Sequence, residues 1–151
     1  DLCEGRSIPD NYIDNLGVIC PPAVGVFILQ SGNNRVAHNH IHDLYYTAIS
    51  LGWNWGYQET PCHHNVVEFN HLHDIGKGVL SDMGAVYTLG IQKGTVIRNN
   101  VIHDVNAYGQ LFLERLTALA GREPPGQRRQ HCKQDSHQKL GCHRPHVDEI
   151  R

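Results

Sequence analysis

The sequence predicts an all-β protein in which short parallel strands wind into a parallel β-helix, a solenoid of about three coils. Two observations predict this fold. Residues 1–109 contain 21 of the 23 valines and isoleucines, and stiff β-branched side chains favour strands because they fit a pleated surface. A six-residue motif also returns in this region at intervals of 31 and 30 residues. The repeats show no long helical periodicity, which favours stacked strands over an ankyrin or TPR array.

The repeated motif contains the first strand-like run of each unit. It reads Asn-His-Ile-His-Asp-Leu from Asn39, and its later copies begin at Asn70 and Asn100. We expect the apolar positions of successive copies to stack inside the solenoid, together with an upstream apolar column. That column comprises Val36, Val67 and Ile97. The asparagine column is expected to mark a turn, because Asn tolerates left-handed backbone geometry and its amides can bond from coil to coil.

A second strand-like run follows each of the first two copies of the motif. Residues 47–52 have the sequence TAISLG, and we align them with AVYTLG at residues 85–90. Parallel strands cannot be joined by a two-residue hairpin, so each coil needs longer connections. Two of these connections, at residues 53–65 and 76–84, are long. Insertions in solenoids gather on one face, which makes these two the predicted binding surface.

Composition divides the chain into three regions. We expect an incomplete coil or loop at residues 1–23, the β-helix repeats at 24–109, and a tail of different character at 110–151. Residues 1–109 contain five basic and ten acidic side chains, whereas the tail contains eight basic and five acidic ones. The tail is expected to be irregular or disordered, with a short helix across residues 110–120 as the partly helical alternative.

Overall composition excludes two classes of partner. The chain has 151 residues, a net charge of −2 and a pI near 6.7, so it lacks the basic footprint of a nucleic-acid-binding protein. No apolar run approaches the roughly 20 residues that span a membrane. The count of five cysteines is odd, which rules out complete internal pairing and indicates no redox compartment.

Three strings carry a resemblance to known proteins: YYTAISLGWNWGY at residues 45–57, CHHNVVEFNHLHDIGKGVLSDMGAVYTLG at 62–90, and GTVIRNNVIHDV at 94–105. They resemble right-handed parallel β-helix proteins of the pectin-lyase-like group. They are most similar to bacterial β-helical glycoside hydrolases such as glycoside hydrolase family 141, which includes α-fucosidase- and xylanase-type enzymes. The resemblance covers residues 24–109 and implies a carbohydrate-active enzyme that is extracellular or periplasmic. It also implies a longer β-helix with a further acidic string after Gly109, so we expect this chain to be a fragment.

Asp82 is the predicted catalytic carboxylate. It lies in the 76–84 insertion, and the resemblance places it in the acidic motif of the hydrolases. A loop carboxylate beside a rigid strand suits an acid or nucleophile, whereas the structural alternative is a turn Asp that caps nearby amides. Glycoside hydrolysis uses two carboxyl groups, about 5–5.5 Å apart for retention or about 6.5–9.5 Å for inversion. None of the other candidates, Glu59, Glu68 and Glu114, has motif support, so activity of this fragment is left open.

Histidine–aspartate pairs recur once in each repeat. They are His42–Asp43, His73–Asp74 and His103–Asp104. Coils about 4.8 Å apart would bring three like charges together. We therefore expect the carboxylates to be solvated or neutralised by the neighbouring imidazoles, and we interpret most of these pairs as structural. His73 is the predicted functional exception, a near-neutral base or sugar-hydroxyl partner that precedes the Asp82 insertion.

Aromatic side chains supply the predicted substrate platform. Trp53, Trp55 and Tyr57 alternate along one loop, and both tryptophans of the chain are among them. Flat rings can pack against a sugar, and the indole N–H adds orientation. The alternative is a loop that folds its aromatics back onto the coil. Tyr87 is a further substrate-binding candidate, although it could equally pack between coils.

No metal or cofactor is predicted, although the chain contains 12 histidines. Cys62 with His63 and His64 offers soft ligands, yet their spacing does not force four zinc ligands to converge. Cys132 and Cys142 in the tail also lack a paired zinc-finger frame. No clustered carboxylate set suggests Ca²⁺.

The sequence therefore predicts part of a glycoside hydrolase whose partner is a plant or complex polysaccharide or oligosaccharide. One alternative is a non-catalytic glycan-binding β-helix module. The other is a polysaccharide lyase, which needs a basic residue to abstract a proton. Lys77, Lys93 and Arg98 are the basic residues around the second and third coils, which weakly disfavours the lyase. Open solenoid ends also predict a tendency to self-associate.

Overall fold

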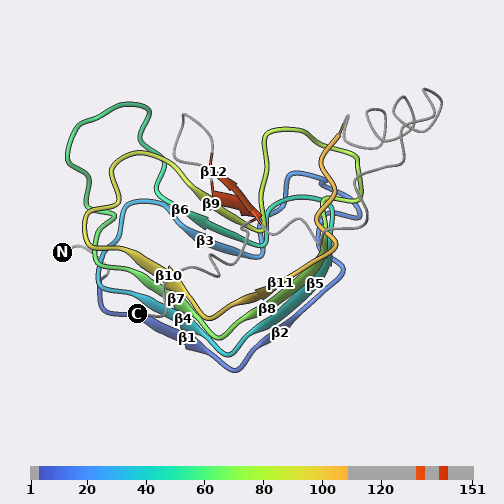
Figure 1. The fold of residues 1–151 in the computed structure, drawn as a ribbon, viewed down its shortest axis with the longest axis horizontal. Helices are drawn as coiled ribbons and strands as arrows, with labels where there is room; N and C mark the ends of the chain where they lie inside the picture. The colour runs from blue at the N-terminus through green and yellow to red at the C-terminus, as the bar shows by residue number, and fades with distance from the viewer. Residues whose placement is uncertain (1–3, 109–131, 135–139, 143–151) are drawn as a thin grey trace, which may run out of the picture.

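A computed structural model describes residues 4–108, 132–134 and 140–142, and it shows three parallel sheets that form the faces of a solenoid (Figure 1). The strands of the solenoid are β1 (Ser7–Pro9), β2 (Tyr12–Ile13), β3 (Val26–Ile28), β4 (Arg35–Ala37), β5 (His40–Leu44), β6 (Ile49–Leu51), β7 (Val66–Glu68), β8 (His71–Ile75), β9 (Val86–Thr88), β10 (Val96–Arg98) and β11 (Val101–Ile102). Two further strands, β12 (Cys132–Gln134) and β13 (Leu140–Cys142), form an antiparallel pair.

Each coil contributes one strand to each sheet. The first sheet has the order β1-β4-β7-β10, the second has β2-β5-β8-β11, and the third has β3-β6-β9. Every neighbouring pair in these sheets is parallel. Three full coils and the start of a fourth therefore confirm the predicted β-solenoid, and the described residues contain no helix.

The core forms where equivalent residues of successive coils stack. Val36 pairs with Val67, which pairs with Ile97, and Ile41 pairs with Leu72. Their burial confirms the predicted apolar columns, and the fully buried side chains of the core also include Leu44, Ile49, Leu51, Ile75 and Val86. Ile97 and Ile102 of the fourth coil are only partly buried, because the described residues place no further coil on them.

The corner between the first two sheets is two residues long in every coil. Its first residue has a positive φ of 53–58° in all four coils: Asp10, His38, Phe69 and Asn99. This left-handed geometry is costly for most side chains, so the rest of the corner must hold it in place. The second corner residue is Asn in every coil: Asn11, Asn39, Asn70 and Asn100.

The asparagines of this corner form a continuous ladder. Asn11 Nδ2 donates to Asn39 Oδ1 at 2.8 Å, Asn39 Nδ2 to Asn70 Oδ1 at 2.9 Å, and Asn70 Nδ2 to Asn100 Oδ1 at 2.9 Å. Each acceptor oxygen also receives the main-chain N–H of the preceding asparagine at 2.9–3.0 Å. The amide column therefore bonds coil to coil, as the sequence predicts, and stabilises the left-handed residue beside it.

A second asparagine ladder lies at the entry to the first sheet. Asn34 Nδ2 donates to Asn65 Oδ1 at 3.0 Å, and the main-chain N–H of Asn65 donates to Thr95 Oγ1 at 3.3 Å. Sequence analysis missed this column, although its members precede Asn39, Asn70 and Asn100 by five residues in each repeat.

An earlier copy of the motif was also missed. Residues 11–16 read Asn-Tyr-Ile-Asp-Asn-Leu, and the structure pairs Tyr12 with His40 and Ile13 with Ile41. β1 and β2 thus stack on β4 and β5 within residues 1–23, the range in which we expected an incomplete coil or loop. Three substitutions in this copy concealed the repeat: Tyr12 and Asp14 replace the two histidines, and Asn15 replaces the aspartate.

The register of the third sheet corrects one sequence alignment. The alignment of residues 47–52 with 85–90 matched Ile49 to Tyr87, whereas the structure pairs Ile49 with Val86 and Ser50 with Tyr87. The error is a single residue. The misalignment arose because every residue of β6 and β9 is buried. No alternation of polar and apolar residues therefore marks the register of these two strands.

The expected tail lies mostly outside the described residues, apart from β12 and β13. The predicted helix at residues 110–120 is also outside them. Within the described part of the chain, no helix has the length and apolar character needed to cross a membrane.

We predict that Asn70→Ala lowers the free energy of unfolding by about 2–3 kcal/mol, because buried main-chain groups lose their partners. Asn70 accepts from the N–H of Asn39 and donates to the carbonyl of Val36. Asn11→Ala is the control, since Asn11 is exposed and its side chain only donates to the ladder. Urea denaturation measures both variants. Equal losses in the two would show that burial of the ladder does not matter.

Candidate functional site

Two loops flank the third sheet (Figure 1). Residues 53–65 follow β6, and residues 76–84 precede β9. Since the strands of this sheet are parallel, the first loop leaves at their carboxyl ends and the second enters at their amino ends. The strands are three residues long, so the two ends are about 10 Å apart along the sheet.

The aromatic loop, residues 53–65, presents its rings to solvent. Trp53, Trp55 and Tyr57 are 47%, 70% and 83% exposed. Trp53 lies edge-on against Phe27 of β3, with ring centroids 5.5 Å apart. One of the three rings therefore folds back onto the coil, while the other two remain outside it.

The aromatic loop is tied to the coils on both sides. Gln30 donates to the side chain of Asn54. Thr60 Oγ1 donates to the carbonyl of Ile91 at 3.1 Å, and Lys93 lies 3.8 Å from Glu59. These contacts restrict the loop that carries the exposed rings.

Asp82 lies on the second loop. It is exposed, and its backbone has a left-handed φ of 58°. Its main-chain carbonyl accepts a hydrogen bond of 2.9 Å from Tyr46 Oη. Main-chain bonds from Gly78 to Asn106 and from Tyr108 to Leu80 hold this loop against the next coil. The predicted carboxylate therefore projects from an anchored loop.

Tyr87 has a different environment from the other predicted sugar-binding aromatics. It lies in β9 opposite Ser50 and is only 4% exposed. Little of its ring is available to a ligand. Trp53, Trp55 and Tyr57 are thus exposed on one loop, whereas Tyr87 is buried.

The outer face of the second sheet carries an array of five stacked histidines. His42 stacks on His73, which stacks on His103, with centroids 4.9 Å apart and planes within 4° of parallel. His40 stacks on His71 beside them, with centroids 4.8 Å apart. In-register pairing of β5 with β8 sets this spacing, because alternate residues of a strand share one face.

Each histidine of the longer column is oriented by the aspartate that follows it. Nδ1 of His42, His73 and His103 lies 2.6–2.8 Å from the adjacent carboxylate. The aspartates have left-handed φ values of 52–56°, which turn their side chains back toward the ring; they are Asp43, Asp74 and Asp104.

On the other side of the ring, Nε2 faces a residue of the preceding coil. His42 bonds to Tyr12 Oη at 2.6 Å, His73 to His40 Nε2 at 2.7 Å, and His103 to His71 Nε2 at 2.8 Å. Because a carboxylate accepts only, Nδ1 carries the proton and Nε2 of each neutral ring presents its lone pair. The outer face of the second sheet thus repeats one hydrogen-bonded arrangement three times. In each, a histidine joins the aspartate of its own coil to a side chain of the preceding coil.

The aspartate column is exposed and paired, as the sequence predicts. Asp43, Asp74 and Asp104 are 41%, 53% and 66% exposed at the side chain. Lys77 lies 2.9 Å from Asp43 and, with His42, lowers the pKa of that carboxyl. Solvent and partners thus relieve the repulsion between stacked carboxylates.

The remaining carboxylates and cations are paired in ways that limit their chemistry. Glu68 is buried between Arg35 and Arg98, which lie 2.9 and 2.8 Å from its two oxygens. Arg98, with a smaller contribution from Arg35, lowers the pKa of Glu68. Lys77 pairs with Asp43 at 2.9 Å, and the exposed Lys93 lies 3.8 Å from Glu59.

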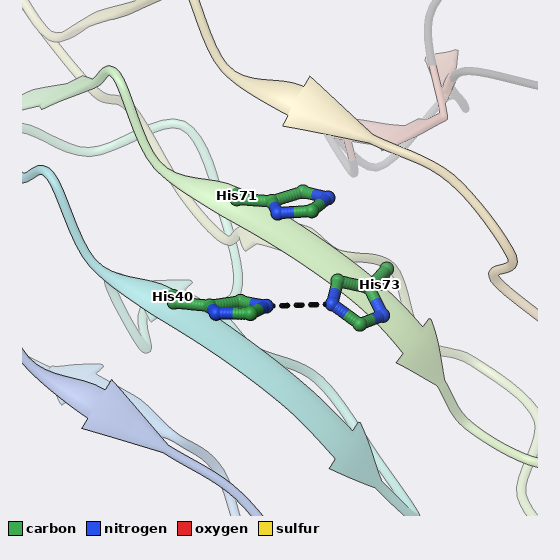
Figure 2. Close-up of side chains that lie close together, drawn as sticks. All are labelled: His40, His71 and His73. Atoms are coloured by element: carbon green, nitrogen blue, oxygen red, sulfur yellow. Dashed lines mark hydrogen bonds between the residues drawn. The ribbon is translucent and has the colours of Figure 1, made fainter.

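One group of three described residues converges well enough to hold a metal ion. His40, His71 and His73 each offer one nitrogen, and these atoms lie within 4.8 Å of one another (Figure 2). Cys62, by contrast, is buried, and its thiol is hydrogen-bonded to Gln92 and Asn65. Burial raises the pKa of this thiol.

The two predicted catalytic residues, His73 and Asp82, lie on different parts of the coil. Both ring nitrogens of His73 are engaged on the second sheet, by His40 and Asp74. Asp82 belongs to the loop that leads into the third sheet. The catalytic role assigned to His73 from sequence stays a prediction.

No family model, curated protein or solved structure matches this chain. The parallel β-solenoid is therefore established by its strand pairing rather than by a relative.

We predict that acidification below pH 6.5 destabilises the fold through His40 and His71. Burial and neighbouring imidazoles, including His73, lower the pKa of both rings from 6.5. The unfolded chain then binds more protons at these positions, so the free energy of unfolding falls as the pH drops through 6.5.

Urea denaturation in EDTA between roughly pH 8 and pH 5 measures this dependence. His40→Gln and His71→Gln should each flatten it, whereas His38→Asn should not. His38 stacks on Phe69 outside the array and has a φ of 58°, which Asn tolerates. The same slope in all three variants would contradict the prediction.

Proposed function

We propose that the chain belongs to a carbohydrate-active β-helix protein that binds a polysaccharide beside its third sheet and hydrolyses it. The observation that carries this proposal is the anchored loop with exposed Trp55 and Tyr57. Two large exposed rings on one anchored loop support a binding surface there. Such rings suit the C–H face of a sugar, and the indole N–H suits its hydroxyl groups.

The structure of the loop favours binding with little rearrangement. Trp53 is fixed against Phe27 at its base, and Thr60 is fixed at its far end. A restricted loop loses less conformational entropy when it binds a ligand. The resemblance to glycoside hydrolases such as family 141 points to the same class of ligand, a plant or complex polysaccharide.

For hydrolysis, we assign one of the two carboxylic acids to Asp82. Its exposed position on an anchored loop is suited to contact with a bound glycan. Glu68 is unsuited to be the second acid, because two arginines hold it as a buried carboxylate. The proposal does not use His73, whose ring nitrogens are both engaged.

A glycan-binding module without catalysis is the second candidate. The exposed rings favour it, because they support binding whether or not a second acid is present. A polysaccharide lyase has less support, since the described lysines that it would use are paired with carboxylates. The effect of Asp82 on turnover separates the hydrolase from the module.

Removal of the exposed rings should weaken glycan binding. We expect Trp55→Ala and Tyr57→Ala each to raise the Kd for a neutral plant polysaccharide such as xylan by about tenfold, or about 1.4 kcal/mol. Affinity electrophoresis with a panel of polysaccharides measures the change. Tyr108→Ala is the control, because Tyr108 is also 70% exposed but lies outside the loop. Equal retardation of wild type and both loop variants in every gel would contradict the proposal.

Asp82→Asn tests the catalytic assignment. Loss of one acid should lower the rate of reducing-sugar release by about a hundredfold or more, with binding retained. Asp10→Asn is a matched control, because both aspartates are exposed and have φ values of 57–58° that Asn tolerates. Binding without turnover in the wild type would favour the module, and an unsaturated product absorbing in the ultraviolet would favour the lyase.

A further inference from the structure

We propose that His40, His71 and His73 form a binding site for a divalent transition-metal ion such as Zn²⁺ on the outer face of the second sheet. The site is independent of the proposed glycan surface, which lies beside the third sheet. It draws two ligands from β8 and one from β5, so the ligands come from two adjacent strands (Figure 2).

Strand geometry brings the three imidazoles together. His71 and His73 are two residues apart on β8 and therefore share a face. His40 pairs directly with His71 across the parallel ladder. The nearest ligand atoms, Nε2 of His40 and Nε2 of His73, are 2.7 Å apart, and all three ligand atoms lie within 4.8 Å.

A tetrahedral ion fits between these rings after small side-chain movements. Zn–N bonds of about 2.0–2.1 Å place two tetrahedral nitrogens about 3.3 Å apart. The His40–His73 pair would open by about 0.6 Å. The His71 nitrogen, which lies within 4.8 Å of the other two, would close by at most about 1.5 Å. Three imidazoles leave the fourth position open, as in the zinc sites that bind water or substrate.

The second layer of contacts also has the form expected of a zinc site. Asp74 accepts from Nδ1 of His73 at 2.7 Å, which fixes the proton there and directs the Nε2 lone pair toward His40. Carboxylates that orient ligating imidazoles in this way are common around metals. When the ion binds, the proton on Nε2 of His40 moves to Nδ1, so the neutral ring becomes a ligand without a change in net charge.

Only nitrogen donors are involved, which selects the class of ion. Imidazole suits Zn²⁺, Cu²⁺ and Ni²⁺, whereas Mg²⁺ and Ca²⁺ prefer oxygen. The sequence pattern that could have revealed the site is His-Leu-His at residues 71–73 with His40 at 31 residues before the first of them. The recurrence of His-x-His at residues 40–42 and of the His–Asp pair in three repeats favoured the interpretation as structural stacking.

Titration of the full chain with Zn²⁺ by calorimetry tests the proposal. We expect His73→Gln and His40→Gln each to lose one equivalent of bound Zn²⁺, while His38→Asn retains it. Circular dichroism and the urea midpoint in EDTA establish that each variant is folded. Unchanged stoichiometry and affinity in both glutamine variants would overturn the proposal.

Co²⁺ distinguishes this site from any metal bound by the cysteines at positions 132 and 142. A three-imidazole site gives visible d–d bands without the near-ultraviolet band of a cobalt–thiolate bond, and those bands should disappear in His73→Gln. A spectrum that shows only the thiolate band would overturn the proposal.

Asp74→Asn provides a second variant that keeps all three ligands. We expect it to weaken Zn²⁺ binding by about 10–100-fold. Asp43→Asn is the control and should stay below about tenfold, because Asp43 orients His42, whose Nε2 bonds to Tyr12 and not to a proposed ligand. The two aspartates have φ values of 52° and 56°, so Asn preserves the backbone in each. Equal effects of the two substitutions would show that Asp74 does not orient a ligand.

Discussion

Amide-to-amide hydrogen bonds at one corner of each coil set the register on which the other features of this protein depend. The ladder through Asn39 and Asn70 joins a side chain and a main-chain N–H of one coil to the same oxygen of the next. Because strand residues alternate between faces, the register that places Ile41 on Leu72 inside also places His42 on His73 outside. The core and the histidine array are two results of one constraint.

Stacking of like residues is favourable inside the solenoid and costly outside it. Apolar side chains gain from burial against identical neighbours, whereas identical charges repel. The second sheet meets this difficulty with imidazoles, which stack as rings and share protons through Nδ1 and Nε2. Each ring of the longer column also bonds the aspartate that follows it in sequence, and Lys77 donates to Asp43.

Sequence reasoning succeeded where the repeat has a fixed length and failed where it does not. The corner at Asn39 is bounded by strands with clear alternation, so the columns around it could be predicted. The coil that contains Asn11 was missed because it replaces a histidine with Tyr12. The third sheet was misaligned by one residue because Val26, Ile49 and Val86 are 23 and 37 residues apart. The contact between His40 and His73 could not be predicted, because the two residues are diagonal neighbours on adjacent strands. An alignment of repeats shows only the residues that lie directly opposite each other.

The unequal connections of the solenoid have a consequence for how it can change. The corner between the first two sheets has two residues in every coil, whereas the connections into the third sheet have 12, 4 and 10 residues, and those out of it have 6, 14 and 7. Lengthening a loop costs only about 0.6 kcal/mol for each doubling, while a residue added at the asparagine corner would shift the whole stack. We therefore expect a foreign peptide to be tolerated in the long connections at residues 52–65 and 76–85, and to disrupt the stack at the asparagine corner.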